Sequence, residues 1–236
     1  LSLGSEMCIR DSTMRKPHLA ILGATGAVGC HIVESLIDNH EIQEIHVFVR
    51  RQVTYTSPKV IVHIVNFDEP REWAHLVTGD ILFSAMGTNR KQAGSKEAQW
   101  TVDYTYQYEM ARIAAQNGVK KYGLVSSLGA NPKSKFFYMS MKGQLEEVVL
   151  ELPFEAIVIA RPSTLIREEP KLVERISCAV LGVINKARVL MSQEPVKTAD
   201  VAKVLVTATI GQQYGISIIF YPSLSIFTCL DNTIFS

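Results

Sequence analysis

The chain has no strong charge of either sign and no long uninterrupted apolar run. Its 236 residues carry a formal net charge of +1, so the overall charge favours neither a nucleic acid nor an anionic membrane as a partner. A membrane-spanning helix needs about 20 mostly apolar residues. Charged residues interrupt the apolar stretch 172–190, and a proline and polar residues interrupt 216–230. We therefore expect no membrane segment.

Cysteine is scarce, and its spacing does not resemble a metal site. Cys8, Cys30, Cys178 and Cys229 include no C-x-x-C pair, and the six histidines form no H-E-x-x-H or other paired pattern. We therefore expect no bound metal. Cys30 falls in a predicted helix, where an isolated thiol packs as a small apolar side chain. Such thiols suit a reducing compartment, so the sequence predicts a cytoplasmic protein.

Apolar residues, in contrast, make up 47% of the chain, which is enough to build a full core. The two ends differ from the rest. Met7–Ser12 resembles the translation of a sequencing-library adaptor, whereas Met14 leads directly into an apolar strand. The sequence predicts a non-native leader over residues 1–13, one domain over 14–226 and an unassigned tail over 227–236.

A glycine-rich turn that joins an apolar strand to a helix is the most specific motif. In a dinucleotide-binding turn the first glycine permits a tight bend, the second lets the backbone approach a pyrophosphate, and the third lets the helix lie close to the sheet. The pyrophosphate then lies on the helix N-terminus, where free N–H groups attract negative charge. A purely structural turn is the alternative. The predicted cofactor-binding residues here are Gly23, Thr25, Gly26, Ala27, Val28 and Gly29.

Strands and helices alternate along the rest of the chain. Strands are predicted near residues 18–22, 45–49, 60–65, 81–86, 122–126, 155–160 and 216–220. Helices are predicted near residues 27–38, 72–77, 98–117, 138–150, 170–185 and 199–209. This alternation predicts an α/β fold of a single domain, a Rossmann-type doubly wound parallel sheet with helices on both faces.

The end of the second predicted strand bears on the choice of cofactor. An NAD site usually carries an acidic residue there, about 20 residues past the glycines, to bind the ribose 2′-hydroxyl. This strand ends instead in Arg50 and Arg51. A guanidinium group can hold a 2′-phosphate, so the sequence predicts NADP, with NAD as the alternative. The structural explanation for the arginines is simple exposure to water.

Further cofactor contacts are predicted where other strands end, because ligands of open α/β sheets bind at the carboxyl edge of the strands. Each of these positions is equally explained by an ordinary turn or strand exit. The residues are Asp68 after the third strand, Met86 and Gly87 after the fourth, Ser126 after the fifth, and Arg161 and Pro162 after the sixth.

A candidate catalytic group follows the fifth predicted strand. Tyr138 and Lys142 are four residues apart at the start of a helix, so they share one helical face. A phenol, with an ordinary pKa near 10, acts as an acid or base at neutral pH only when a nearby cation favours the phenolate. Lys142 could supply that charge, and Ser127 could donate a hydrogen bond to a substrate carbonyl. The alternative is an exposed tyrosine and a solvated lysine.

Taken together, these motifs resemble the short-chain dehydrogenase/reductases. Blocks at 87–90, 93–95, 102–103, 125–131, 142–146 and 161–163 resemble the atypical branch that includes the Tat-interacting-protein-like oxidoreductases. The resemblance extends from Met14 to about Ser225. It implies an NADP-preferring Rossmann domain in which Ser127, Tyr138 and Lys142 match the catalytic serine, tyrosine and lysine.

This resemblance implies an enzyme, an NADP-dependent oxidoreductase that reduces a small carbonyl compound. About seventy residues follow the sixth predicted strand, which leaves little room for the large substrate domain of a sugar-nucleotide epimerase. The alternative function is an NADP(H)-binding sensor that acts through a protein partner without turnover. Substrate specificity would reside in the loops after Ser127 and Arg161.

Overall fold

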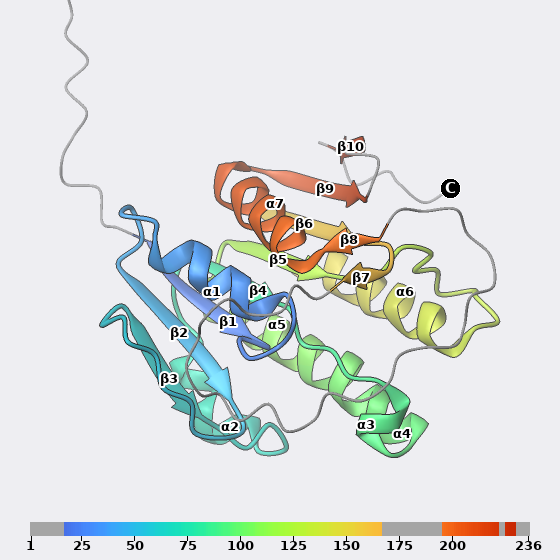
Figure 1. Cartoon of the computed structure of the whole chain (residues 1–236), viewed down its shortest axis with the longest axis horizontal. Coiled ribbons are helices and arrows are strands. Elements are labelled where there is room, and N and C mark those ends of the chain that lie inside the picture. Colours follow the sequence, from blue (N-terminus) through green and yellow to red (C-terminus); the bar gives the residue numbers. More distant parts are fainter. Residues whose placement is uncertain (1–16, 167–194, 222–224, 230–236) are drawn as a thin grey trace, which may run out of the picture.

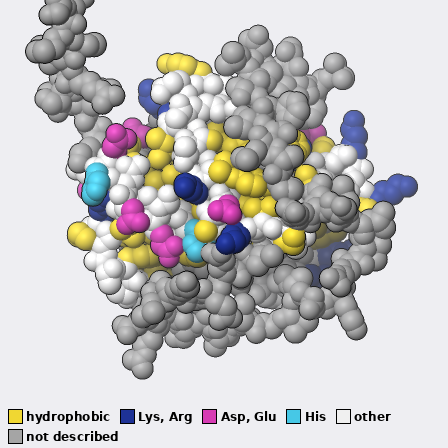
Figure 2. Space-filling view, turned by 45° about the horizontal axis from the view of Figure 1, so that its top comes forward, with side chains coloured by type: hydrophobic (Ala, Val, Ile, Leu, Met, Phe, Trp, Pro, Cys, Tyr) yellow, Lys and Arg dark blue, Asp and Glu magenta, His cyan; other side chains and the backbone are white. Residues whose placement is uncertain are grey.

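The computed structural model describes residues 17–166, 195–221 and 225–229. The predicted leader at 1–13 and the predicted helix at 170–185 lie outside the described residues. Among the described residues we find no helix with the length and apolar content that a bilayer crossing requires. On the face seen in Figure 2, basic and acidic side chains are interspersed rather than separated by sign.

One large sheet forms the centre of the molecule (Figure 1). Its order is β3-β2-β1-β4-β5-β6-β9-β10, with all neighbours parallel except β9 and β10. The strands are β1 (His18–Leu22), β2 (Glu44–Val49), β3 (Val60–Ile64), β4 (Ile81–Ser84), β5 (Lys121–Val125), β6 (Ala156–Arg161), β9 (Gly215–Phe220) and β10 (Ser225–Cys229). A short parallel pair, β7 (Leu165–Ile166) and β8 (Val196–Lys197), lies apart from it. The strand order reverses at β1, so β1 and β4 mark the switch point where such sheets bind ligands.

Helices cover both faces of this sheet. They are α1 (Gly29–Ile37), α2 (Pro70–Trp73), α3 (Arg90–Ala93), α4 (Lys96–Trp100), α5 (Tyr106–Gln116), α6 (Phe137–Leu150) and α7 (Thr198–Gly211), with a 3₁₀ turn at Ala74–Leu76 and a π-helical turn at Thr101–Thr105. The predicted α/β fold is therefore confirmed, and the seven predicted strands are the seven parallel strands. The structure adds three strands, β7, β8 and β10, that the sequence did not predict. It also divides the predicted helix 98–117 into α4, the π-helical turn and α5.

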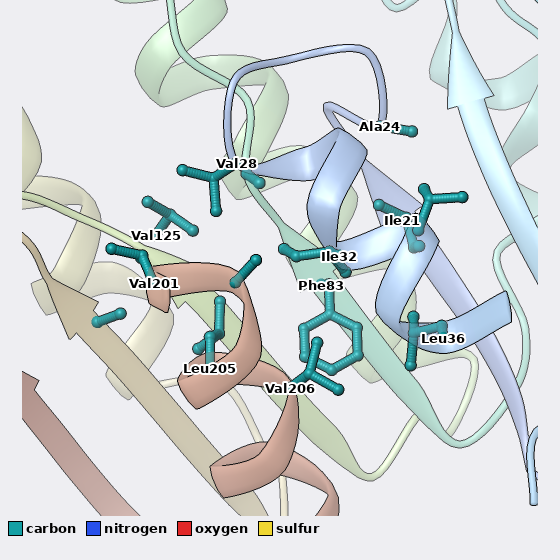
Figure 3. Close-up of a cluster of buried hydrophobic side chains, with 14 of the residues drawn as sticks. Ile21, Ala24, Val28, Ile32, Leu36, Phe83, Val125, Val201, Leu205 and Val206 are labelled. Carbon is teal, nitrogen blue, oxygen red and sulfur yellow. The ribbon is translucent and has the colours of Figure 1, made fainter. Parts of the chain in front are cut away.

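Two apolar layers hold the helices on the sheet. Figure 3 shows the layer in which α1 and α7 pack side by side over β4 and β5. The buried side chains there include Val28, Ile32, Leu36, Phe83, Val125, Val201, Leu205 and Val206. The opposite layer joins α2, α5 and α6 to the other face. Burying each large aliphatic side chain contributes about 1.5–3 kcal/mol, so this packing fixes the ends of the strands that carry the candidate site.

Candidate cofactor and active site

The glycine-rich turn after β1 requires glycine at two positions for steric reasons. Gly23 has φ +85°, and a Cβ there would lie 2.5 Å from the Met86 nitrogen. A Cβ on Gly29 would lie 2.0 Å from the Gly23 carbonyl oxygen, far below the van der Waals contact distance of the two atoms. The first glycine thus lets the turn touch the loop after β4, and the third lets α1 approach the strand end. Both match the roles that a dinucleotide-binding turn requires.

Two other glycines, Gly26 and Gly87, are less crowded than Gly23 and Gly29. A Cβ on Gly87 would meet no atom within 4 Å, and its φ is not in the left-handed region. A Cβ on Gly26 would come no closer than 3.1 Å to the Gly23 oxygen. The fold alone therefore tolerates a small side chain at Gly87, with only a slight adjustment needed at Gly26. Both glycines lie at the carboxyl edge of β1 and β4, where open α/β sheets bind their ligands.

The start of α1 offers hydrogen-bond donors to an anion. Thr25 is exposed, Ala27 is half-buried, and Val28 is the buried N-cap residue immediately before the helix. No side chain of the described residues caps this N-terminus, and its first turn contains no acidic residue. Free N–H groups and the positive end of the helix dipole favour a phosphate in this position.

The end of β2 brings Arg50 near a pair of polar side chains. Arg50 and Arg51 are both exposed. The Tyr106 hydroxyl of α5 donates to Asp68 at 2.6 Å. Burial raises the pKa of Tyr106 to about 12, the Asp68 carboxylate adds to the shift, and Arg50 opposes it. Arg50, Asp68 and Tyr106 therefore meet at one corner of the site, and Arg51 projects into solvent beside them.

Ser127 and Tyr138 are brought together by the loop between β5 and α6. The Asn131 N–H donates to the Met139 carbonyl at 3.0 Å, which folds the loop back onto the first turn of α6. Tyr138 exposes 37% of its surface. Desolvation nevertheless raises the pKa of Tyr138 to about 12, Asp103 raises it further, and a hydrogen bond with Ser127 opposes the shift. In the absence of a ligand Tyr138 is therefore a protonated phenol. Its pKa is raised, whereas the nearness of Lys142 led us to expect a lowered pKa, because burial and the Asp103 charge outweigh the hydrogen bond with Ser127.

Gly143 makes this close approach of loop and helix feasible. A Cβ there would lie 2.2 Å from the Pro132 nitrogen and 2.3 Å from the Asn131 carbonyl carbon. We did not predict a role for Gly143 from the sequence. The signal was present, however, since Gly143 follows Lys142 in the middle of a predicted helix, where glycine destabilises by about 1 kcal/mol unless packing requires it.

Lys142 lies buried below Tyr138 on α6. Desolvation lowers the pKa of its ammonium group, while the negative charges of Asp103 and Glu146 raise it. Burial raises the pKa of the Asp103 carboxyl. The charge of Lys142 and the hydrogen bonds from Thr88 and Gln99 lower it, but by less. Two carboxylates therefore flank the buried ammonium group and oppose its loss of charge.

Asp103 also connects α6 to the loop after β4. It lies fully buried in the π-helical turn at Thr101–Thr105, and such turns are frequent at functional sites. Its Oδ1 accepts the Thr88 N–H at 2.7 Å, and its Oδ2 accepts from Gln99 at 3.4 Å. The Thr88 contact fixes the loop that contains Gly87 and Met86, the latter half-buried. The carboxylate is thus shared between the loop and the region of Lys142.

Ser126 and Arg161 meet in an ion-paired network behind the catalytic candidates. The Ser126 hydroxyl donates to Glu146, and Arg161 donates to the same carboxylate with Nη2 and with Nε, the latter at 3.1 Å from each oxygen. The Arg161 guanidinium also lies 5.4 Å from the Phe220 ring centre. Pro162 is buried and accepts the Leu128 N–H. The side chains of Ser126 and Arg161 are thus engaged with protein, and the sequence did not single out Glu146 as their partner.

Comparison with known proteins supports the cofactor interpretation. The family model described as NAD(P)H-binding matches residues 23–210. The mitochondrial fmp52 protein of Emericella nidulans is 35% identical over 193 residues, which cover 78% of this chain and 83% of that protein. The oxidoreductase ylbE of Lactococcus lactis has a TM-score of 0.60 at 21% identity, covering 82% of this chain and 84% of its own. MoeE5, solved with UDP-glucuronic acid and NAD, has a TM-score of 0.65 at 15% identity, with 89% and 78% covered.

These relatives correct one expectation. The isolated thiol of Cys30 led us to predict a cytoplasmic protein, and this prediction is wrong, because the curated fungal relatives are named mitochondrial. Cysteines without disulfide-like spacing indicate only a reducing environment, which does not distinguish one intracellular compartment from another.

Proposed function

Since the chain belongs to the NAD(P)H-binding family and to the FMP52 proteins, we propose that it is an NADP-dependent oxidoreductase that reduces a small carbonyl compound. In this proposal Ser127 orients the carbonyl oxygen, Tyr138 donates the proton, and Lys142 holds the nicotinamide ribose. The cofactor, when bound, supplies the hydride.

The observation that carries this proposal is the state of Tyr138. Its hydroxyl interacts with Ser127, and its pKa of about 12 keeps it protonated at neutral pH. Reduction of a carbonyl requires a proton donor at the oxygen that becomes a hydroxyl. Tyr138 exposes 37% of its surface, and the adjacent Ser127 would supply a second hydrogen-bonding group for the same carbonyl oxygen.

The glycine-rich turn and the corner at Arg50 support the cofactor part of the proposal. We propose that Gly23, Gly26 and Gly29 shape the pyrophosphate site, with donors from the start of α1. Exposed Arg50 and Arg51 would bind a 2′-phosphate, since no acidic side chain ends β2. Asp68, paired with Tyr106, would lie beside the adenine. Met86 and Gly87 would lie beside the nicotinamide ring.

Replacing Tyr138 by phenylalanine tests the catalytic role. The change removes one hydroxyl and keeps the ring, so folding and cofactor binding should persist. NADPH consumption with small aldehydes and ketones should fall by about 10²- to 10⁴-fold. Tyr214→Phe, at an exposed tyrosine far along the chain, is the matched control and should leave the rate unchanged. Equal turnover by Tyr138→Phe and Tyr214→Phe would exclude a proton-donating role.

The same experiment addresses the alternative function. A protein that only senses NADP(H) would turn over no carbonyl compound, with or without Tyr138, while still binding NADPH.

Gly87→Ala tests the placement of the cofactor. Its methyl group meets no protein atom, so a loss of NADPH affinity with unchanged melting would indicate a steric clash with the ligand. Gly211→Ala, equally free of contacts at the end of α7, is its control.

We also propose that the protein acts in mitochondria, because its curated relatives are named mitochondrial proteins. Fractionation of cells that express the full chain with a C-terminal tag tests this. Recovery of the tagged protein only in the cytosolic fraction would contradict the proposal.

A further inference from the structure

A second group of chemically active side chains lies at the opposite edge of the sheet from the glycine-rich turn. His18 begins β1, Glu44 begins β2, and His46 follows two residues later on the same face of β2. The strand register pairs His18 directly with Glu44. One ligand atom from each of these three residues lies within 4.8 Å of the other two. We propose that these residues form a binding site for a divalent transition-metal ion, of which Zn²⁺ is the best match.

The geometry around Glu44 supports this proposal. Its Oε2 lies 3.1 Å from His18 Nδ1 and 3.3 Å from His46 Nε2. A tetrahedral zinc ion with ligands at 2.0–2.1 Å places them about 3.4 Å apart. Two of the three ligand separations therefore already have nearly the required length. Only the two imidazole nitrogens would have to move closer for all three atoms to coordinate one ion.

The chemistry of the donor set indicates which ion would bind. Two imidazole nitrogens and one carboxylate oxygen form a common set of protein ligands for zinc, with water in the fourth position. Imidazole also suits copper and nickel, whereas Mg²⁺ and Ca²⁺ prefer oxygen ligands only. The side chains of His18, Glu44 and His46 expose 22%, 36% and 16% of their surfaces. An ion from solution can therefore reach them.

His63 on β3 would support the site from behind. Its Nε2 lies 2.8 Å from Nδ1 of His46. A neutral histidine that binds metal through Nε2 carries its proton on Nδ1, and in this structure that proton would be donated to His63. Ligating histidines usually make such a hydrogen bond, which fixes both the tautomer and the orientation of the ring. The rings of His46 and His63 also stack, with centroids 5.1 Å apart. His63 is therefore a positioning residue in this proposal.

This site could not be predicted from spacing in the sequence, because its ligands come from two strands. Spacing rules detect ligands that lie on one helix or one loop. Here 26 positions separate His18 from Glu44, and only the parallel pairing of β1 with β2 brings them together. This explains how the expectation of no metal site arose from the same six histidines.

Titration of the chelator-treated full-length chain with ZnCl₂, followed by calorimetry, tests the proposal. We expect about one Zn²⁺ per chain, and visible absorption bands of a coordinated ion when Co²⁺ replaces Zn²⁺. Glu44→Gln and His46→Gln, which preserve side-chain size, should abolish this binding. His63→Phe should weaken it by about 10- to 100-fold. His63→Gln retains an acceptor and should weaken it less.

A matched control is available on α1. His31 and Glu34 form a pair at 2.9 Å with no third ligand in the described residues, so His31→Ala should leave Zn²⁺ binding unchanged. Absence of stoichiometric binding by the unsubstituted chain would overturn the proposal. Binding that survives both Glu44→Gln and His46→Gln would also overturn it, by placing the ion elsewhere. Melting curves recorded in chelator show whether each variant is folded, and NADPH titration of Glu44→Gln keeps this result separate from the cofactor site.

Discussion

Replacing Arg161 by methionine should destabilise the fold markedly, because it leaves a buried carboxylate without its main counter-charge. The side chain of Glu146 is only 4% exposed and that of Arg161 only 19%. Removing one partner of a buried ion pair typically costs about 3–5 kcal/mol. We expect the low end of this range, about 3 kcal/mol. Ser126 still donates to Glu146, and the positive charge of Lys142 remains near.

Urea unfolding followed by circular dichroism measures this effect. With a slope of about 3 kcal/mol/M for a chain of this size, the midpoint should fall by about 1 M urea. Glu109→Gln is the control, since Glu109 pairs with Arg112 on the partly exposed surface of α5. Its loss should cost less than about 0.5 kcal/mol.

The double variant Arg161→Met/Glu146→Leu distinguishes an unpaired charge from lost packing. If the unpaired carboxylate causes the destabilisation, removing it as well should restore much of the stability, as replacement of both partners by apolar residues often does. The reasoning is refuted if Arg161→Met costs no more than Glu109→Gln. It is also refuted if the double variant is less stable than Arg161→Met alone.

Four further predictions concern the cofactor site, the catalytic site and the leader. Arg50→Ala and Arg51→Ala should weaken NADPH binding by about tenfold or more and leave NADH binding nearly unchanged, since each removes a charge-assisted hydrogen bond. Calorimetry measures both affinities. Equal affinities of the unsubstituted chain for NADPH and NADH would contradict NADP preference. Because the pKa of Tyr138 is about 12, kcat/KM for carbonyl reduction should show no fall from Tyr138 ionisation below about pH 10. Asp103→Asn removes a negative charge that raises the pKa of both Tyr138 and Lys142, so the fall should move to lower pH; an unchanged pH profile would argue against this coupling. A chain that begins at Met14 should melt at the same temperature as the longer one, and a clear drop in melting temperature would show that residues 1–13 contribute to the fold.

Local sequence patterns were sufficient to predict the regular elements. Short, mostly apolar runs mark β1, β2, β4, β5 and β6, and most of their residues are buried in the sheet. The glycine spacing predicted the turn after β1, because Gly23 has the positive φ of a tight bend and the collision at Gly29 is with Gly23, six residues earlier. Sequence patterns over a few residues can predict backbone geometry and burial where these depend on neighbouring residues.

Features that depend on contacts between distant elements could not be predicted in this way. The π-helical turn interrupts an otherwise ordinary helical pattern. Asp103 in this turn accepts a hydrogen bond from Thr88. Gln107 donates to the Asp103 carbonyl and accepts from the Ser84 hydroxyl. The pairing of Glu146 with Arg161 joins a helix to a strand end, and neither residue carries a local signal for it. Both features lie beside the candidate site, where buried polar groups require partners from elsewhere in the fold.

The buried charges around Lys142 belong to one electrostatic unit. Burial alone would favour a neutral amine, whereas binding a ribose hydroxyl and stabilising a nearby phenolate both benefit from an ammonium group. Asp103 and Glu146 each raise the pKa of Lys142, and each is held in place by a different partner, Thr88 in one case and Arg161 in the other. Burying two carboxylates is unfavourable in itself, and both of these carboxylates favour the charged form of the buried lysine. The loop after β4 and the end of β6 thereby act on the same residue of α6.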